Sequence, residues 1–447
     1  MKIPQSPPNL DDLVAAAISG DLIRTISSSS PLDPKGRYLH WDDLRYKTPP
    51  DGLTVEQWWL GTAFARRSIS RPLPLRGVDG AGFKFCNIDR IQQVVHHIDQ
   101  QASGQILADD DVTSLTSSDR YLVSSLVEEA ITSSQLEGAA TTRRVAKELL
   151  QTGRPARNRH EQMILNNYKA MLSAETMAKT GETLTVQAVL DLHRIVTADA
   201  LDDPEDAGRL QSDEEQRIVV RWDDQILHRP PPASELPERM QRMCDFANGE
   251  LTEGFTHPVV RAIVLHFWLA YDHPFADGNG RTARALFYWS LLRDGYWLAQ
   301  YISISSILRK APSKYAKSYL HVETDGNDMT YFIIYQLRVI ERAIDALRDY
   351  LGRKVAETRQ IETLLRGSQL LNHRQLVVVG DALRDPGESF TIKAQSMRHG
   401  VTYQSARTDL LGLVGLGLFT KQKAGQRYIF NPEEDLSERL ESLVETR

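Results

Sequence analysis

The sequence has few of the features that mark disulfide-stabilised, zinc-binding or membrane-spanning proteins. It holds two cysteines in 447 residues, Cys86 and Cys244, and neither lies in a CxxC or Cys/His cluster. Two thiols in so long a chain do not form a disulfide framework, so we expect both to be buried free thiols in a reducing compartment. No run of about 18 apolar residues is present, which argues against a transmembrane helix.

An excess of positive charge is also missing. The net charge is −6, which argues against a protein coated in basic charge for nucleic acid but leaves room for a local basic patch. The N-terminal apolar stretch is short and follows Asp11 and Asp12, unlike the apolar core of a signal peptide. We therefore expect a cytoplasmic protein with no membrane partner.

The length predicts roughly three domains. From about residue 54 to 365, apolar residues recur three and four positions apart, which predicts a mainly α-helical chain. One β-like segment, QRIVVRWDDQILHRPPP from Gln216, interrupts the helices and predicts a small hairpin around Asp223 and Asp224. We expect an irregular and helical N-terminal region at 1–115, a helical core at 116–365 and a separate domain at 366–447.

The pattern of the last 80 or so residues predicts a winged helix. A helix, a helix–turn–helix pair with Gly400 in the turn, a hairpin with Ala424 and Gly425 at its tip, and an acidic terminal helix follow one another. The segment from Arg366 to Pro432 carries nine Lys and Arg against four Asp and Glu. Binding of DNA, binding of protein and dimerisation all remain open for this domain.

The stretch HPFADGNGRTAR, from His273 to Arg284, concentrates polar chemistry directly after the apolar run AIVLHFWLAY. A calcium loop would need oxygen ligands where Arg281 and Tyr288 stand. A Walker A loop would need Gly-Lys-Ser/Thr, which Arg281 and Thr282 do not supply. A phosphate site at the start of a helix remains, with a glycine-rich corner of solvated charges as the alternative.

The residue types of this stretch fit the chemistry of phosphate transfer. Gly278 and Gly280 allow a tight turn whose amides point at an anion, and two arginines three apart, Arg281 and Arg284, suit a polyphosphate. Asp277 beside phosphates indicates Mg²⁺, and His273 can take a proton near neutral pH. Together they predict transfer of a nucleotidyl or phosphoryl group onto an acceptor that His273 deprotonates.

HPFADGNGRTAR resembles the Fic motif, His-Pro-Phe-x-Asp/Glu-Gly-Asn-Gly-Arg-x-x-Arg, at every defined position. The resemblance extends over about 120 to 345, and a winged helix is a common C-terminal companion in the family. It implies a Fic-type helical core and transfer of AMP from ATP to a Ser, Thr or Tyr hydroxyl of a target protein. His273 would be the base, Phe275 would anchor the loop and Asp277 would hold Mg²⁺. The nucleotide-binding residues implied in the motif are Asp277, Gly278, Asn279 (on the α-phosphate), Gly280, Arg281, Thr282, Ala283 and Arg284.

Two segments outside the motif acquire roles from the same resemblance. The hairpin takes the place of the family's flap, which puts Gln225, Ile226, Leu227 and His228 beside the nucleotide and lets its edge register a target segment; a plain surface hairpin is the alternative. Tyr315 falls where the family often has an adenine-contacting tyrosine. Glu323 stands where the family often has asparagine, and this departure puts the adenine pocket in doubt.

The stretch SSQLEG, from Ser133 to Gly138, ends a helical pattern near 120–138. Ser133 and Glu137 are four residues apart and share a helix face. By itself the stretch reads as a solvated helix end, but it is similar to the family's inhibitory motif. The resemblance implies that Glu137 pairs with Arg284, takes the fork that would hold the γ-phosphate, and so inhibits the enzyme from within the chain.

Other functions stay open beside the enzyme. A transcription regulator that senses nucleotide through the Fic domain and binds DNA through the winged helix is one, and a homodimer is compatible with it. Transfer of phosphate or phosphocholine, and removal of AMP from a modified target, use several of the same residues and form the other group.

Overall fold

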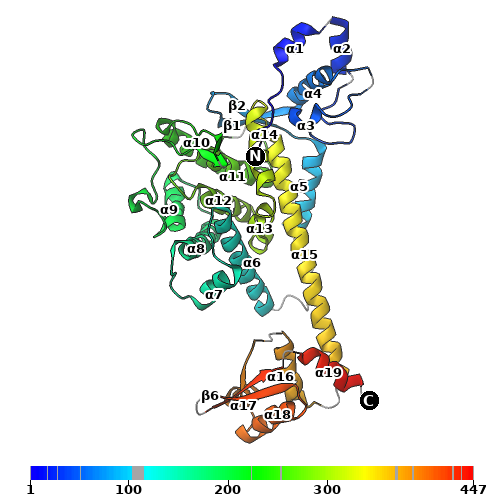
Figure 1. The fold of residues 1–447 in the computed structure, drawn as a ribbon, viewed down its shortest axis with the longest axis vertical. Coiled ribbons are helices and arrows are strands. Elements are labelled where there is room, and N and C mark those ends of the chain that lie inside the picture. The colour runs from blue at the N-terminus through cyan, green and yellow to red at the C-terminus, as the bar shows by residue number, and fades with distance from the viewer. Residues whose placement is uncertain are drawn as a thin grey trace. The chain divides into compact units, whose positions relative to one another are not determined.

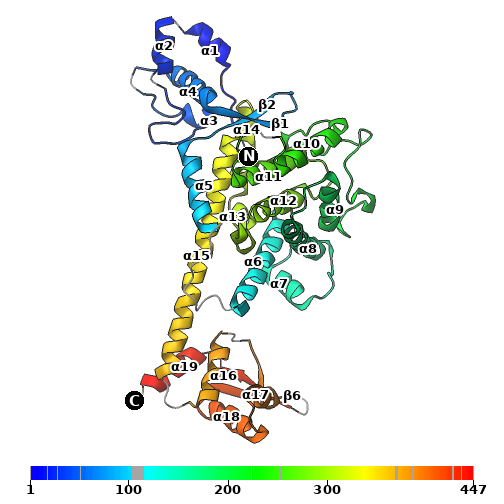
Figure 2. The ribbon, with the colours of Figure 1, turned by 180° about the vertical axis from the view of Figure 1, so that it is seen from behind.

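The protein is mainly α-helical, as the sequence predicts. We describe a computed structural model that covers residues 2–17, 19–27, 29–50, 52–102, 115–222, 224–251, 254–367, 371–384, 387–424, 427–433 and 435–445. It divides into two compact units, Met1–Asp345 and Ala346–Arg447, and each is described by itself (Figures 1 and 2).

Helices dominate the first unit, and some begin with side-chain caps. Thr54 forms a capping box with Gln57 at the start of α4, a pattern that satisfies two amides at a helix start. The helices are α1 (Leu10–Ala16), α2 (Ser19–Ser27), α3 (Trp41–Leu44), α4 (Val55–Ile69), α5 (Asp89–Ala102), α6 (Leu115–Leu136), α7 (Arg143–Thr152), α8 (Arg159–Thr180), α9 (Val186–Thr197), α10 (Leu236–Asn248), α11 (Pro258–Asp272), α12 (Asn279–Arg293), α13 (Ile304–Leu308), α14 (Pro312–Thr324) and α15 (Thr330–Gly367), with short 3-10 helices at Pro204–Asp206, Ala233–Glu235 and Trp297–Tyr301.

Two small antiparallel hairpins accompany these helices. The predicted one is present as β3 (Val220–Trp222) and β4 (Gln225–His228). The other, β1 (Ser70–Arg76) and β2 (Gly82–Cys86), lies where we predicted helix. That prediction was wrong because the apolar residues of this segment alternate with Pro72 and Pro74, and proline interrupts a helix.

Helices α11 and α12 lie among the other helices of this unit (Figure 1). They pack on each other, and α12 also packs on α8, which in turn packs on α6 and α9. Twelve of the fifteen residues of α11 are buried, which explains its almost continuous apolar sequence. The corner between α11 and α12 is therefore held by a rigid core on several sides.

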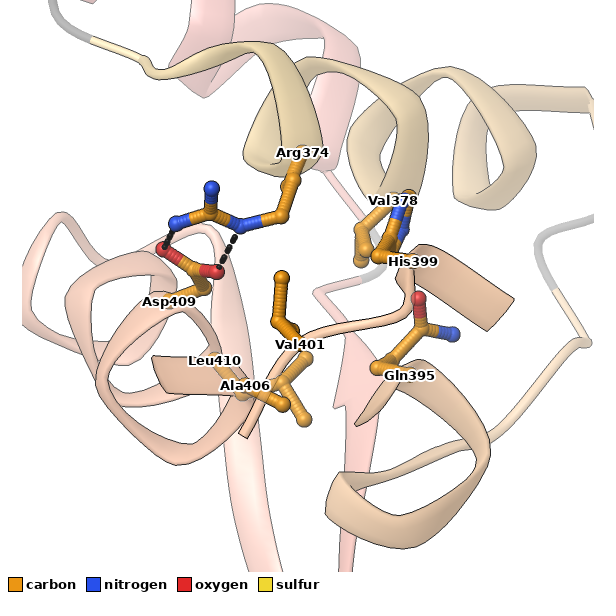
Figure 3. Close-up of a pocket in the computed structure, with 8 residues that line it drawn as sticks. All are labelled: Arg374, Val378, Gln395, His399, Val401, Ala406, Asp409 and Leu410. Atoms are coloured by element: carbon orange, nitrogen blue, oxygen red, sulfur yellow. Dashed lines mark hydrogen bonds and ion pairs between the residues drawn. The ribbon is translucent and has the colours of Figure 1, made fainter. Parts of the chain in front are cut away.

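The second unit contains the elements predicted for the C-terminal domain. Its helices and strands are α16 (His373–Arg384), β5 (Phe390–Thr391), α17 (Ile392–His399), α18 (Tyr403–Gly415), β6 (Phe419–Ala424), β7 (Arg427–Pro432) and α19 (Leu436–Glu445), after the end of α15. The strands form an antiparallel sheet in the order β5-β7-β6, and Gly400 ends α17 in the left-handed conformation. A small cavity between α16, α17 and α18 is lined by Arg374, Gln395 and His399 among others, and contains no residue of the motif (Figure 3).

Two expectations from composition can be compared with these coordinates. Cys86 and Cys244 are buried and unpaired, as predicted. Within the described residues, no helix is both long enough and apolar enough to cross a membrane.

Candidate active site

The motif forms the corner between α11 and α12. Helix α11 ends at Asp272, and His273 caps it in the left-handed conformation with φ 45°, which is uncommon for a residue with a side chain. Gly278, at φ 84°, starts α12 without a side-chain cap. The first amides of α12 therefore have no capping side chain from this position and face the inside of the corner, where an anion would be stabilised.

Asn279 holds this corner closed. Its amide oxygen accepts from the backbone N–H of Phe275 (2.9 Å), and its amide nitrogen donates to the carbonyl of Phe275 (2.8 Å). The same nitrogen lies 3.2 Å from Nδ1 of His273. We predicted that Asn279 would steady the α-phosphate; the structure instead uses its amide to shape the loop and orient the His273 ring.

His193 on α9 supports the loop from below, a role that the sequence gave no reason to expect. Its ring stacks on Phe275 with 3.7 Å between centroids. Nδ1 accepts from the N–H of Gly208 (3.0 Å), so Nε2 carries the proton and donates to the carbonyl of Asp277 (2.8 Å). Burial lowers the pKa of His193 to about 4, which keeps the ring in this neutral form.

His273 is partly exposed and its imidazole is neutral at physiological pH. Burial, with help from the nearby charges of His228 and Arg217, lowers its pKa to about 4, whereas Glu137 and Asp277 act in the opposite direction. A neutral imidazole is the form that can accept a proton from a hydroxyl group. The structure is therefore compatible with the predicted role of His273 as a base.

The predicted contact between Glu137 and Arg284 is present. Glu137 Oε1 accepts from Nη2 of Arg284 at 2.8 Å, and the guanidinium is 1% exposed. Ser133 holds the same group through its hydroxyl (2.8 Å from Nε) and its carbonyl (3.0 Å from Nη2). Burial alone would lower the pKa of Arg284, but the Glu137 carboxylate raises it above the ordinary value. Gly138 then turns the chain at φ 90°.

Glu137 lies against the start of α12. A Cβ built on Gly280 would overlap Glu137 Oε1 and would come within 3.0 Å of Nη1 of Arg284. The carboxylate therefore occupies the place at the helix N-terminus where an anionic ligand would be stabilised. The chain itself supplies a negative group to the site that the sequence predicted for phosphate.

The other charged residues of the motif bind one another. Arg281 is fully buried and donates to the carbonyl of Val196 (3.1 Å). Asp277, whose side chain is 39% exposed, lies 3.3 Å from Arg281 and 3.5 Å from Arg159. In this conformation Arg281 stabilises the contact between α12 and α9, and it does not face the corner as Arg284 does.

Thr282 and Ala283 are buried in α12. The Thr282 hydroxyl donates to the carbonyl of Gly278 (2.9 Å), as threonine commonly does inside a helix. Both residues were predicted to bind nucleotide. Their side chains instead pack in the core, so only backbone at the start of α12 remains for that role.

The hairpin residues divide into two groups. Gln225 is exposed, and Ile226 and Leu227 are partly exposed, so these three are accessible to a ligand or to a target segment. His228 is buried and lies 2.8 Å from the Glu323 carboxylate through Nδ1 and 2.7 Å from the carbonyl of Tyr271 through Nε2. We predicted His228 beside the nucleotide; both of its nitrogens are instead engaged with the protein.

Tyr315 lies behind Arg284 rather than in an open pocket. Its hydroxyl is 2.9 Å from Nε2 of His266 and 3.0 Å from the hydroxyl of Tyr319. Burial raises its pKa, and the charge of Arg284 opposes that shift. A role in binding adenine stays a prediction.

A metal site made of protein ligands alone is absent from the part of the chain that the structure describes, where no three His, Cys, Asp or Glu side chains converge. Mg²⁺ usually keeps several waters and takes one or two carboxylates together with substrate phosphates. The partly exposed Asp277 fits that mode as a single carboxylate. Its two arginine neighbours, Arg159 and Arg281, would share it with the ion.

Residues 183–291 match the Fic/DOC family. The chain is 32% identical over 171 residues to a protein adenylyltransferase Fic of Nematostella vectensis, which covers 38% of this chain and 36% of that protein. It is 26% identical over 271 residues to a protein adenylyltransferase Fic of Aedes aegypti, which covers 58% of this chain and 50% of that protein. The match thus spans at most half of these curated relatives.

The fold is similar to that of a solved structure. A Fic family protein from Desulfovibrio desulfuricans G20 superposes with a TM-score of 0.51 at 18% identity, covering 78% of this chain and 98% of that one. At this identity the similarity concerns the fold, and it agrees with the helical core predicted from the sequence.

Proposed function

Because the chain carries a domain of the Fic/DOC family, we propose that it is a protein adenylyltransferase that moves AMP from ATP to a Ser, Thr or Tyr hydroxyl of a target protein. The observation that carries this proposal is the position of Glu137. Its carboxylate lies on the start of α12 and on Arg284, which indicates that the corner beside His273 is built to bind an anion.

The reaction follows from the groups around the corner. The first amides of α12 and the guanidinium of Arg284 hold the phosphates. His273 accepts the proton of the target hydroxyl as its oxygen attacks the α-phosphorus. A P–O bond forms to the target, the bond between the α-phosphorus and the bridging oxygen breaks, and pyrophosphate leaves. Asn279 keeps the His273 ring oriented throughout, through its bond to Nδ1.

Mg²⁺ would be held by Asp277 and by the phosphates of ATP. When bound, it neutralises the negative charge that develops on the phosphates. The chain's own contribution is a carboxylate that Arg159 and Arg281 hold at the edge of the corner.

We also propose that the contact between Glu137 and Arg284 inhibits the enzyme. Arg284 cannot give the same Nη2 hydrogen both to Glu137 and to a phosphate oxygen. ATP would then bind without its outer phosphates in the productive place. Ser133 keeps the guanidinium oriented in either case, so that loss of Glu137 alone frees the fork.

The test compares labels on two phosphates. The variant Glu137→Gly is incubated with a cell lysate and ATP labelled at the α-phosphate or at the γ-phosphate, and modified proteins are identified by mass. Label from the α-phosphate alone, lost in the double variant with His273→Ala, is the expected result. Label from the γ-phosphate would indicate phosphate transfer, and loss of AMP from a premodified protein would indicate the reverse reaction.

A second candidate function is binding of nucleic acid by the predicted winged helix at 366–447. From Ile392 to Pro432 the sequence holds six Lys and Arg and one acid, Asp409. Asp409 is buried and bound by Arg374, so no acid is left on the surface of these elements. Exposed Arg407 on α18 and exposed Lys421 and Lys423 on β6 would face phosphates.

The charge-reversal variant Lys421→Glu, measured by anisotropy of a labelled duplex DNA, tests this candidate. Binding should weaken with rising salt and weaken further in the variant. Salt-independent or absent binding would leave a protein partner or dimerisation, which light scattering distinguishes from a monomer.

A further inference from the structure

Two basic side chains, one near each end of the β3–β4 hairpin, bind the last two carbonyls of α11. Nε2 of His228 lies 2.7 Å from the carbonyl of Tyr271. Nη2 of Arg217 donates to the carbonyl of Asp272 at 2.7 Å. These carbonyls immediately precede His273, the residue to which the proposed reaction assigns the proton transfer.

The end of α11 needs such partners. The last carbonyls of a helix have no intrahelical donor, and donors with positive charge suit the negative end of the helix dipole. His273 then continues in the left-handed conformation, which costs a residue with a side chain on the order of 1 kcal/mol or more. Contacts that fix the preceding two peptides therefore help to keep His273 in its observed place.

Both basic residues are themselves fixed from the other side. Nδ1 of His228 lies 2.8 Å from the Glu323 carboxylate on α14. A carbonyl and an ionised carboxylate both accept hydrogen bonds, so the imidazolium form, with two N–H groups, satisfies both. Arg217 donates through Nε to the carbonyl of Pro231 at 2.9 Å and also binds the side chain of Gln211. Arg217 thus ties together the segments before and after the hairpin.

We propose that Arg217 and His228 are positioning residues that hold the hairpin and His273 in one fixed frame. The exposed part of the hairpin, at Gln225 and Ile226, then keeps a constant position relative to the imidazole. A target hydroxyl carried by a segment that pairs with this hairpin meets His273 in a reproducible geometry. This inference rests on the proposed function, because it concerns the same reaction.

The experiment uses the brake-released variant Glu137→Gly as the starting protein. His228→Asn and Arg217→Gln are added to it one at a time, and incorporation of α-labelled AMP into the chain itself and into lysate proteins is followed over a range of ATP concentrations. We expect kcat to fall by about a hundredfold, as a small misplacement of reacting groups can cause. We expect KM for ATP to stay within about twofold, because neither residue faces the start of α12.

Two matched variants separate positioning from general damage. Arg217→Lys keeps one donor for the Asp272 carbonyl and should restore part of the rate. Arg221→Gln removes a charge from an exposed position of the same hairpin and should leave the rate unchanged. If a clamp variant does not fold, Glu323→Gln decides, because it weakens the hold on His228 but keeps the packing; we expect it to lower kcat by a smaller factor.

The outcomes for the two proposals are distinct. Absence of AMP transfer in Glu137→Gly itself would contradict the proposed function. Transfer in Glu137→Gly that stays the same in the folded His228→Asn, Arg217→Gln and Glu323→Gln variants would overturn this inference alone. A rise in KM for ATP with kcat preserved would also overturn it, since that would place the two residues in nucleotide binding.

Discussion

Removing Glu137 gives the sharpest test of the site. In the parent protein a nucleotide must displace Glu137 from Arg284 before the outer phosphates can use the fork. Their hydrogen bond is 2.8 Å long, Arg284 is 1% exposed and Glu137 is 30% exposed. A hydrogen bond to a charged group in such surroundings contributes about 1.5–3 kcal/mol.

That free energy sets the expected gain. At about 1.4 kcal/mol per factor of ten, loss of the competitor should raise productive ATP binding by roughly 10- to 150-fold. We expect AMP transfer at low ATP concentration to rise by the same factor in Glu137→Gly. The cost is stability, because the buried Arg284 loses a charged partner, and we expect the free energy of unfolding to fall by about 1–3 kcal/mol.

The assay is incorporation of α-labelled AMP, measured beside ATP affinity and urea denaturation. Glu137→Gln, which keeps an acceptor without the charge, should give an intermediate rate. Glu128→Gln removes a carboxylate from the same helix, where it binds the exposed Arg143, and should leave the rate unchanged. A Glu137→Gly protein that binds ATP as tightly as expected and still transfers AMP no faster than its parent would refute this reasoning.

Three more outcomes follow from the same contacts. Gly280→Ala should lower the melting temperature of the parent, because the new Cβ overlaps Glu137, and should lower it much less in Glu137→Gly; equal losses in calorimetry would contradict the overlap. Arg239→Ala should cost about 3–5 kcal/mol in urea denaturation, because it leaves the buried Asp272 carboxylate, 2.7 Å from Arg239, without its partner. Stability should fall as the pH drops from 6.5 to about 4, because burial lowers the pKa of His193 to about 4 and the unfolded chain binds more protons in that range; His193→Gln should flatten this part of the curve.

Local patterns in the sequence were enough to predict much of the corner. The apolar run before His273 and the glycines after it define a helix, a tight turn and a second helix, and the structure has all three. The hairpin near Asp224 and the elements of the C-terminal unit also follow from local alternation and turn residues. By contrast, the contact between Glu137 and Arg284 joins residues 147 positions apart, and only the resemblance to a known family indicated it.

The residues that sequence reasoning misplaced share one property: their partners lie far along the chain or within the loop backbone. Arg281 and Arg284 are three positions apart and were expected to act alike, but α9 supplies a buried carbonyl to Arg281 alone. His193 has the sequence context of an ordinary core histidine. Asn279 could have been suspected from its spacing of four from Phe275, which allows both backbone bonds.

Gly280 connects the inhibited and the proposed active states. The missing Cβ leaves room for Glu137 in the observed structure, and the same space would let a phosphate approach the amides of α12. The two states therefore differ by which anion fills one surface, while Ser133 keeps Arg284 oriented through bonds that do not involve Glu137. Activation then requires the displacement of a single carboxylate and no rearrangement of α6. It follows that Ser133→Ala should not mimic Glu137→Gly, since it loosens the guanidinium that both anions need.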